Sequence, residues 1–335
     1  MKRFEWVQAS TTDDALGQST RTCAELMDSN KKTSGASVVK AGGIDLLDLL
    51  KEGILSTQRV VNIRSIDDLH HISFDKKGCV IGPLLTLAEI AEHADIRKKF
   101  TALADAAEHI ATPNIRNAAT VGGNLLQRPR CWYFRSEEFN CLKKGGKDCP
   151  ANVGENKYHA IFDNEKCSIV HPSTAAVALV ALGASIELTS RKGKREVKLE
   201  EFFISPSEDV VKENRLAEGE LITAITIPDN GWKSAHIKLG EKDSFDWSIG
   251  DCAVALDMEG STCKKAVIVL GAAAPVPYRA TAAENFLKGK SIDEKTAREA
   301  GKLAVQNAKP LSQNEYKVTM LEVAAMRALL KAAQS

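Results

Sequence analysis

Two neighbouring stretches of this sequence carry residue types that bind cofactors. The first, ATPNIRNAATVGGN, covers residues 111–124 and ends in a glycine pair. Adjacent glycines in a turn let backbone N–H groups approach an anionic ligand closely. The second stretch follows it and spreads four cysteines over a polar, lysine-bearing segment; they are Cys131, Cys141, Cys149 and Cys167. Because this segment has too few aliphatic residues for a core of its own, a metal centre would supply the missing cross-links.

The cysteine spacing leaves the identity of such a centre open. Nine, seven and seventeen residues separate consecutive cysteines, which matches neither a ferredoxin pattern nor the paired CxxC of zinc ribbons. A 4Fe-4S cluster, a structural zinc ion and unliganded thiols are therefore three open interpretations. Nearby basic residues would offset an anionic cluster, although a solvated loop explains them equally well. They are Arg128, Arg130, Arg135, Lys143, Lys144 and Lys147. Four other cysteines are interpreted as buried small hydrophobes on helices or strands; they are Cys23, Cys79, Cys252 and Cys263.

A second glycine pair precedes the first, with Gly42 and Gly122 lying 80 positions apart. Residues 37–40 predict a strand that runs into AGGID at Ala41, and leucines at helical spacing follow. Strand, glycine turn and helix start form an anion cradle, because unpaired N–H groups and the helix dipole favour a phosphate. A tight turn without a ligand explains the same residues, and the Rossmann GxGxxG spacing is absent. Two such turns together suit a ligand with two adjacent phosphates, such as a dinucleotide.

Composition restricts the function classes. The chain has 335 residues, 44% of them hydrophobic, and a formal net charge of +1, which predicts a globular protein of two or three units and argues against nucleic acid as a partner. No apolar run approaches membrane-spanning length, so no membrane insertion is expected. The N-terminal MKRFEWVQAS lacks the apolar core of a signal peptide. We therefore expect a cytoplasmic protein with free thiols or metal-bound cysteines, unless a partner chain carries it across a membrane.

Hydrophobic patterning predicts strands and helices along the whole chain. Strands are expected at residues 60–63, 79–81, 185–189 and 197–203. Thr86 and Glu89 form a capping box that opens a helix at residues 87–93, and residues 101–110 and 174–182 predict further helices. Beyond a turn at residues 228–231, three strands at 234–239, 252–258 and 266–270 predict a small antiparallel sheet. Three helices follow at 280–287, 293–307 and 316–333, and the last one is interpreted as core rather than as a partner-binding face.

Taken together in order, several stretches resemble the FAD-binding subunit of the molybdenum hydroxylases. They are AGGID at Ala41, IRNAATVGGN from Ile115, HPSTAAVALVALGASIEL from His171, GELITAITIP from Gly219, SAHIKL from Ser234 and GAAAPVPYRATAAE from Gly271. The resemblance implies an α+β fold in which a two-part FAD-binding domain covers residues 1–230. Its parts are a small βαβ subdomain, 1–60, and a mixed or antiparallel sheet subdomain, 61–230. A C-terminal antiparallel sheet and helix domain covers residues 231–335.

The same resemblance implies the residues that bind FAD. Two glycine loops would hold the pyrophosphate, Ile110 and Ile222 would lie against the flavin ring, and Lys238 would make a polar contact near it. Without the resemblance, Ile222 is a plain inward-facing strand residue. The loop positions are Val38, Val39, Lys40, Ala41, Gly42, Gly43, Ile44, Asp45 and Leu46 in the first loop, and Thr120, Val121, Gly122, Gly123 and Asn124 in the second. The chain departs from relatives at Thr174, Ile44, Trp247 and Asp251.

The cysteine segment, an insertion at residues 125–170, resembles that of one subset of the family in particular. In periplasmic aldehyde oxidoreductases and 4-hydroxybenzoyl-CoA reductases such an insertion holds a 4Fe-4S cluster beside the flavin. The resemblance to the aldehyde oxidoreductase version implies that Cys131, Cys141, Cys149 and Cys167 bind a 4Fe-4S cluster. The chain would then pass electrons from a molybdopterin-binding large subunit and a 2Fe-2S small subunit to an external acceptor, with no catalytic residue for the substrate of its own.

Three other functions stay open at this point. One is the flavoprotein subunit of a 4-hydroxybenzoyl-CoA reductase-type enzyme, in which electrons flow inward. Another is a stand-alone flavoenzyme of the same fold, like the reductase of cell-wall precursor synthesis. The third is a zinc-stapled nucleotide-binding protein without redox chemistry.

Overall fold

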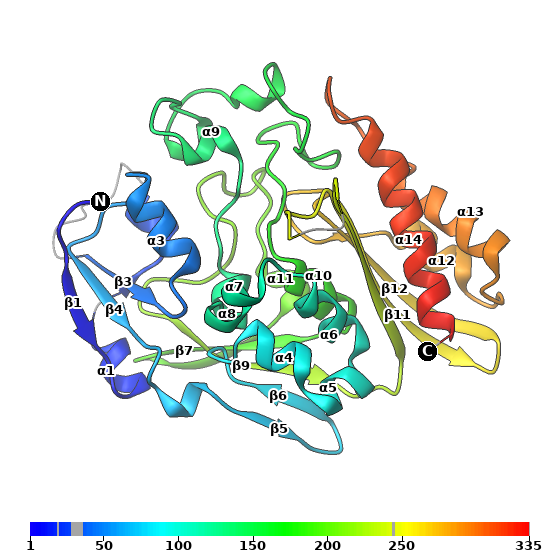
Figure 1. Cartoon of the computed structure of the whole chain (residues 1–335), viewed down its shortest axis with the longest axis horizontal. Coiled ribbons are helices and arrows are strands. Elements are labelled where there is room, and N and C mark those ends of the chain that lie inside the picture. The colour runs from blue at the N-terminus through cyan, green and yellow to red at the C-terminus, as the bar shows by residue number, and fades with distance from the viewer. Residues whose placement is uncertain (19, 28–35, 243–244, 335) are drawn as a thin grey trace.

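The computed structural model describes residues 1–18, 20–27, 36–242 and 245–334. Three β-sheets follow one another along the chain, and helices separate or cover them (Figure 1). The cysteine segment lies at one end of the molecule, between the first helices and the C-terminal helix (Figure 1). The architecture is mixed α+β, as predicted.

The first sheet is parallel and has the strand order β1-β4-β3-β2. Its strands are β1 (Glu5–Gln8), β2 (Thr20–Arg21), β3 (Ser37–Lys40) and β4 (Arg59–Asn62), and its helices are α1 (Thr12–Leu16), α2 (Cys23–Met27) and α3 (Ile44–Lys51). Leu49 and Leu50 of α3 pack against Val38 and Val60 of the central strands. The strand, glycine turn and helix expected around Gly42 are therefore present.

The second sheet is antiparallel, with the order β5-β6-β9-β7-β8. Its strands are β5 (Ile72–Phe74), β6 (Gly78–Ile81), β7 (Ser185–Ser190), β8 (Gly193–Lys198) and β9 (Leu221–Pro228), and η1 (Asp67–Leu69) leads into it. One strand prediction is wrong. Residues 197–203 divide between the end of β8 and the helix α11 (Leu199–Phe202), which buries Leu199 and Phe202 against the sheet core.

A group of helices lies between β6 and β7 in the chain, and two of its members pack against the third sheet. They are α4 (Leu87–Glu92), α5 (Ala94–Lys99), α6 (Thr101–Glu108), α7 (Pro113–Ala118), α8 (Val121–Leu125) and α10 (Thr174–Ala181). Every residue of α10 is buried, because it contacts α6, α8 and two strands of the third sheet, β11 (Gly250–Glu259) and β12 (Thr262–Gly271). A helix that is apolar all round is typical of such a position. The capping box of Thr86 and Glu89 opens α4 as predicted.

The third sheet is antiparallel and begins just after residue 230. Its strands are β10 (Lys233–Leu239), β11 (Gly250–Glu259), β12 (Thr262–Gly271) and β13 (Tyr278–Arg279), and its helices are α12 (Thr281–Leu287), α13 (Glu294–Val305) and α14 (Tyr316–Gln334). Leu321 and Leu329 of α14 are fully buried on this sheet, which confirms the core interpretation of the last helix. The domain boundaries at residues 60 and 230 stay predictions.

The cysteine segment has little regular structure of its own. It contains α9 (Trp132–Arg135), η2 (Leu142–Lys144) and η3 (Pro150–Asn152), and no β-strand occurs within residues 125–170, all of which the structure describes. Tyr133 and Phe134 pack into the core of the first sheet, whereas Ile161 and Phe162 belong to the core of the third. The segment therefore packs its apolar residues into the cores of the two units that it joins.

Candidate functional site

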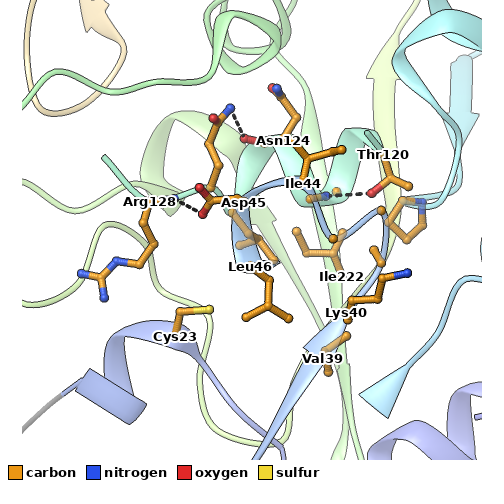
Figure 2. A pocket seen from close by; sticks show the side chains of 18 of the residues that line it. Cys23, Val39, Lys40, Ile44, Asp45, Leu46, Thr120, Asn124, Arg128 and Ile222 are labelled. Atoms are coloured by element: carbon orange, nitrogen blue, oxygen red, sulfur yellow. Dashed lines mark hydrogen bonds between the residues drawn. The ribbon is translucent and has the colours of Figure 1, made fainter. Parts of the chain in front are cut away.

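A pocket of about 440 Å³ lies where the first and second sheets meet. Figure 2 shows that β3, the start of α3, the start of α8 and β9 contribute its walls. Fifteen of the seventeen predicted FAD-binding residues line it. They are Val38, Val39, Lys40, Ala41, Gly42, Gly43, Ile44, Asp45, Leu46, Ile110, Thr120, Gly122, Gly123, Asn124 and Ile222. Val121 is instead fully buried in the core, and Lys238 lies outside the lining.

The first glycine loop needs both of its glycines. Gly43 adopts φ +84°, in the left-handed region that favours glycine. A Cβ atom at Gly42 would lie 2.2 Å from the carbonyl oxygen of Ala118, so Gly42 lets the two glycine segments approach each other. Gly43 is the N-cap of α3, and no side chain of the described residues caps this helix start. The first N–H groups of α3 consequently face the pocket region without a side-chain acceptor from that part of the chain, as an anion cradle requires.

The second glycine segment was predicted to be a turn whose backbone N–H groups can bind an anionic ligand, and the structure differs from this prediction. Thr120 caps the one-turn helix α8, and its hydroxyl accepts a hydrogen bond from Gly123 N at 3.2 Å. Gly122 N donates to Pro83 O at 2.9 Å, and Asn124 N donates to Thr120 O at 2.8 Å. A Cβ atom at Gly122 would lie 2.7 Å from the Pro83 side chain. This segment therefore forms a part of the pocket wall with few side-chain atoms. The first loop is the segment that provides backbone N–H donors for an anionic ligand.

Apolar side chains and fixed carbonyls form another part of the pocket wall. Ile222 extends from β9 into it (Figure 2), and Ile110 follows α6. Arg116 donates to the carbonyls of Ile110 and Ala111 at 3.1 and 2.6 Å. Ala111 has φ +46°, an uncommon conformation for a residue with a Cβ atom. The hydrogen bonds from Arg116 therefore fix the backbone conformation at Ile110 and Ala111.

The two lysines near the pocket have different roles. Lys238 donates from Nζ to His109 O at 2.8 Å and therefore supports the segment behind Ile110. Burial lowers the pKa of Lys238. Lys40 does line the pocket, and its Nζ donates to Asn62 Oδ1 at 3.2 Å. Burial and the charge of Arg64 lower the pKa of Lys40.

Sequence reasoning missed several lining residues. Cys23, interpreted as a buried hydrophobe, is half-buried and lines the pocket (Figure 2). Burial, with the nearby charge of Asp45, raises the pKa of its thiol to about 12. Arg128, Glu213 and Trp247 also line the pocket. No local pattern marks them, because each comes from a different part of the chain. Cys79, Cys252 and Cys263 are fully buried, as predicted.

Asp45 connects the pocket to the cysteine segment. Its Oδ1 atom lies 2.9 Å from Arg130 and 2.6 Å from Arg135. Its Oδ2 atom accepts from Arg128 N at 2.9 Å, a bond drawn in Figure 2. The carboxylate at the start of α3 therefore binds three groups of the cysteine segment. Arg130 also lies over the ring of Trp247, 4.6 Å from its centroid.

A second link is a buried ionic triad. Glu213 Oε1 lies 2.9 Å from Arg128 Nη2 and 2.7 Å from Lys143 Nζ, and both cations are 1% exposed. Burial raises the pKa of Glu213, but Arg128 and Lys143 outweigh it and hold that pKa below the ordinary value. These basic residues are thus buried and paired, so the solvated-loop interpretation is wrong for Arg128 and Lys143.

The four cysteines of the segment line one small enclosed cavity. Cys131, Cys141, Cys149 and Cys167 share it with Lys143 and apolar neighbours. A hydrogen bond with Cys167 lowers the pKa of Cys149 to about 6 and raises that of Cys167. Burial raises the pKa of Cys131 to about 11. None of the eight cysteines, all of which lie within the described residues, forms a disulfide.

The cavity does not have the geometry of a single-ion site. Over the part of the chain that the structure describes, no three His, Cys, Asp or Glu side chains are arranged to hold one metal ion. A zinc site needs four ligands converging on one point. In a 4Fe-4S cluster each cysteine binds a different iron, so the sulfurs surround a volume instead. The four thiols therefore share one cavity without converging on a single point.

Comparison with known proteins identifies the class of protein to which this fold belongs. Residues 2–230 match the family "FAD binding domain in molybdopterin dehydrogenase". Residues 235–332 match the "CO dehydrogenase flavoprotein C-terminal domain". The chain belongs to this family of FAD-binding subunits, which confirms the family resemblance, the fold class and the assignment as an oxidoreductase subunit.

Individual relatives span nearly the whole chain. It is 31% identical over 304 residues to the aldehyde oxidoreductase FAD-binding subunit PaoB of Escherichia coli K12, covering 89% of this chain and 92% of that protein. It is 23% identical to the glyceraldehyde dehydrogenase medium chain of Sulfolobus acidocaldarius, covering 98% of each. Quinoline 2-oxidoreductase from Pseudomonas putida 86 superimposes with a TM-score of 0.74 at 23% identity, covering 100% of this chain and 99% of that one; this last similarity concerns the fold. Among the described residues, no helix has the length and apolar character needed to cross a membrane.

Proposed function

We propose that this chain is the FAD and 4Fe-4S electron-transfer subunit of a multi-subunit molybdenum-containing aldehyde oxidoreductase. The observation that carries the proposal is the gathering of Cys131, Cys141, Cys149 and Cys167 around one cavity, in a segment tied to the flavin pocket. The similarity to an aldehyde oxidoreductase subunit along 89% of the chain supports the substrate class.

The pocket suits FAD through its backbone and charges. The uncapped start of α3 and the cation of Lys40 would hold the pyrophosphate, with the glycines admitting it closely. Ile110 and Ile222 would shield the ring system from water. Bound FAD supplies two-electron chemistry that can be divided into single-electron transfers. Asp45, by contrast, would act on the cofactor only indirectly, because its oxygens bind the cysteine segment.

The cysteine cavity suits a cluster through its donors and its surroundings. Four thiolates would supply the ligands, and the buried cation of Lys143 lies in the cavity wall. The triad of Arg128, Lys143 and Glu213 has two cations and one anion, so its net positive charge would offset part of the negative charge of an iron–sulfur cluster. The cluster would supply one-electron transfer next to the flavin.

The remaining parts of the proposal concern the intact enzyme. A molybdopterin-binding large subunit would oxidise the aldehyde, and a 2Fe-2S small subunit would pass the electrons to this chain. An external acceptor would then receive them. Cytoplasm is the proposed compartment, and export together with a signal-bearing partner is the alternative that cell fractionation decides.

The test is the cofactor content of the protein purified with its partner subunits. We expect FAD, together with four irons and four acid-labile sulfides beyond those of the 2Fe-2S chain, and aldehyde-dependent reduction of an artificial acceptor. FAD with no additional iron would refute the cluster while leaving the family assignment intact. Zinc in place of iron, without flavin, would support the zinc-stapled alternative.

A further inference from the structure

His159 is the one histidine of the cysteine segment, between Cys149 and Cys167 in sequence. Its side chain is buried, with the residue 4% exposed. The Nε2 atom lies 3.2 Å from the Sγ atom of Cys131. The other ring nitrogen, Nδ1, is also buried and has no hydrogen-bond partner among the described residues. Because a thiolate sulfur only accepts hydrogen bonds, the ring proton belongs on Nε2 whenever Cys131 is a metal-bound thiolate.

The C-terminal domain fixes the position of this histidine. Its carbonyl oxygen accepts hydrogen bonds from Asn314 Nδ2 at 3.0 Å and from Lys317 Nζ at 2.9 Å. Its N–H group donates to Asn156 O at 3.0 Å. The ring packs edge-on against Trp132, with centroids 5.1 Å apart. Backbone and ring are both restrained, so the Nε2 atom is directed at one particular sulfur.

We propose that His159 is a positioning residue that donates an Nε2–H hydrogen bond to the Cys131 sulfur and raises the reduction potential of the cluster. This inference rests on the proposed function, because it requires the cluster. When the cluster accepts one electron from a neighbouring redox centre, no bond forms or breaks and one negative charge is added. A donor to a ligand sulfur stabilises that more negative state most, and such hydrogen bonds are among the factors that set iron–sulfur potentials.

Two variants distinguish an effect of the hydrogen bond on the cluster potential from an effect of side-chain packing. His159→Leu removes the donor, and His159→Gln keeps an N–H donor on a side chain of similar length. His93→Leu is the matched control, because His93 Nδ1 is also buried without a partner in the described part of the chain and its ring packs against Phe74. Each variant is studied as the purified holoprotein by redox titration of the reduced-cluster EPR signal, with the FAD potential measured in the same samples.

We expect His159→Leu to retain the cluster signal and shift its midpoint potential to a more negative value. His159→Gln should remain close to the wild type, and the FAD potential should not move in either variant. His93→Leu should leave both potentials unchanged.

Other outcomes would overturn the inference in distinguishable ways. An unchanged cluster potential in His159→Leu would show that the hydrogen bond has no influence. Equal shifts in the Leu and Gln variants would assign the effect to packing or hydration. Loss of the cluster from both variants, with FAD retained, would make His159 an iron ligand. If the variants do not fold, resonance Raman spectra of the wild type in H2O and D2O replace them, and iron–sulfur bands without an isotope shift would refute the bond. A wild type that contains no cluster iron would instead refute the proposed function itself.

Discussion

The flavin pocket and the cysteine cavity are built from different parts of the polypeptide. In the pocket, missing side chains matter most: Gly42 and Gly122 allow segments to meet at distances that a Cβ atom forbids. In the cavity, the candidate ligands are four cysteine side chains, and the backbone around them has little regular structure. Substitutions that add side-chain atoms should therefore impair the pocket, whereas substitutions that remove side chains should impair the cavity.

The two regions are nevertheless joined. Asp45 reaches from the pocket to Arg130 and Arg135, and Glu213 pairs with Arg128 on the pocket side and with Lys143 on the cavity side. Some substitutions should therefore affect one region alone, and others should affect both.

Cys149→Ala should have the largest effect and should be confined to the cavity. One ligand is removed from a set of four, so we expect the cluster iron to be lost while FAD remains bound. Iron, sulfide and flavin analysis of the purified protein measures this. The control is Cys263→Ala, a buried cysteine of the third sheet, which should keep its iron. Retention of the full cluster in Cys149→Ala would contradict the proposed ligand set.

Glu213→Gln should damage both regions. Removing the one anion leaves two buried cations unpaired, which costs about 3–5 kcal/mol of unfolding free energy. Denaturant unfolding measures the loss, and FAD and iron content should fall together. The control is Glu208→Gln, whose exposed pair with Arg215 contributes roughly 0–1 kcal/mol. A preparation that loses only one of the two cofactors would show that the triad does not join the regions.

The same residue gives a pH dependence. The pKa of Glu213 is lower in the folded protein than its ordinary value, so its contribution to stability is complete above that ordinary value, about 4.3. The contribution is lost as the pH falls through the lower folded pKa. Unfolding free energies measured from pH 7 downward should therefore fall less steeply in Glu213→Gln than in the wild type. Parallel curves would mean that another carboxyl controls acid stability.

Gly42→Val should affect the pocket alone. Its Cβ atom would contact Ala118 O, and overpacking of this kind costs about 1–3 kcal/mol. If the first loop must move away, FAD affinity should fall roughly 5- to 150-fold, while iron content stays constant. Flavin fluorescence titration gives the affinity. Gly240→Ala is a mild control, because its Cβ atom would approach Lys242 O only to 3.3 Å. Wild-type FAD affinity in Gly42→Val would show that the close approach of the two glycine segments is not needed for FAD binding.

Asp45→Asn should have the smallest of these effects. Its ion pairs are partly buried, so we expect a loss of about 1–2 kcal/mol, between the values for exposed and buried pairs. Asp48→Asn, whose exposed carboxylate lies 3.4 Å from Arg130, should cost less than about 0.5 kcal/mol. Thermal unfolding measures both. Equal losses in the two variants would show that Asp45 is not the main link from α3 to the cysteine segment.

Local patterns in the sequence were sufficient for most of the fold. The capping box at Thr86, the strand and glycine turn before α3 and the three C-terminal helices all depend on residues close in the chain. The strand predicted at residues 197–203 failed because Leu199 and Phe202, three positions apart, bury the same face of a short helix against the sheet core. Part of the pocket lining was also predictable, because thirteen of its forty residues lie in two contiguous glycine segments.

The sequence by itself determined which segments bear the glycines and the cysteines, since residue type and spacing need no knowledge of distant neighbours. Only the tertiary structure decided which of those groups line the pocket or the cavity. In the folded protein the Asp45 carboxylate binds the cysteine segment, and the N–H groups of Gly122 and Asn124 donate hydrogen bonds within the protein. Cys23 lines the pocket, and His159 lies beside Cys131. Apart from the local bond between Asn124 N and Thr120 O at the start of α8, each of these placements depends on how separate elements pack, and no local pattern encodes that.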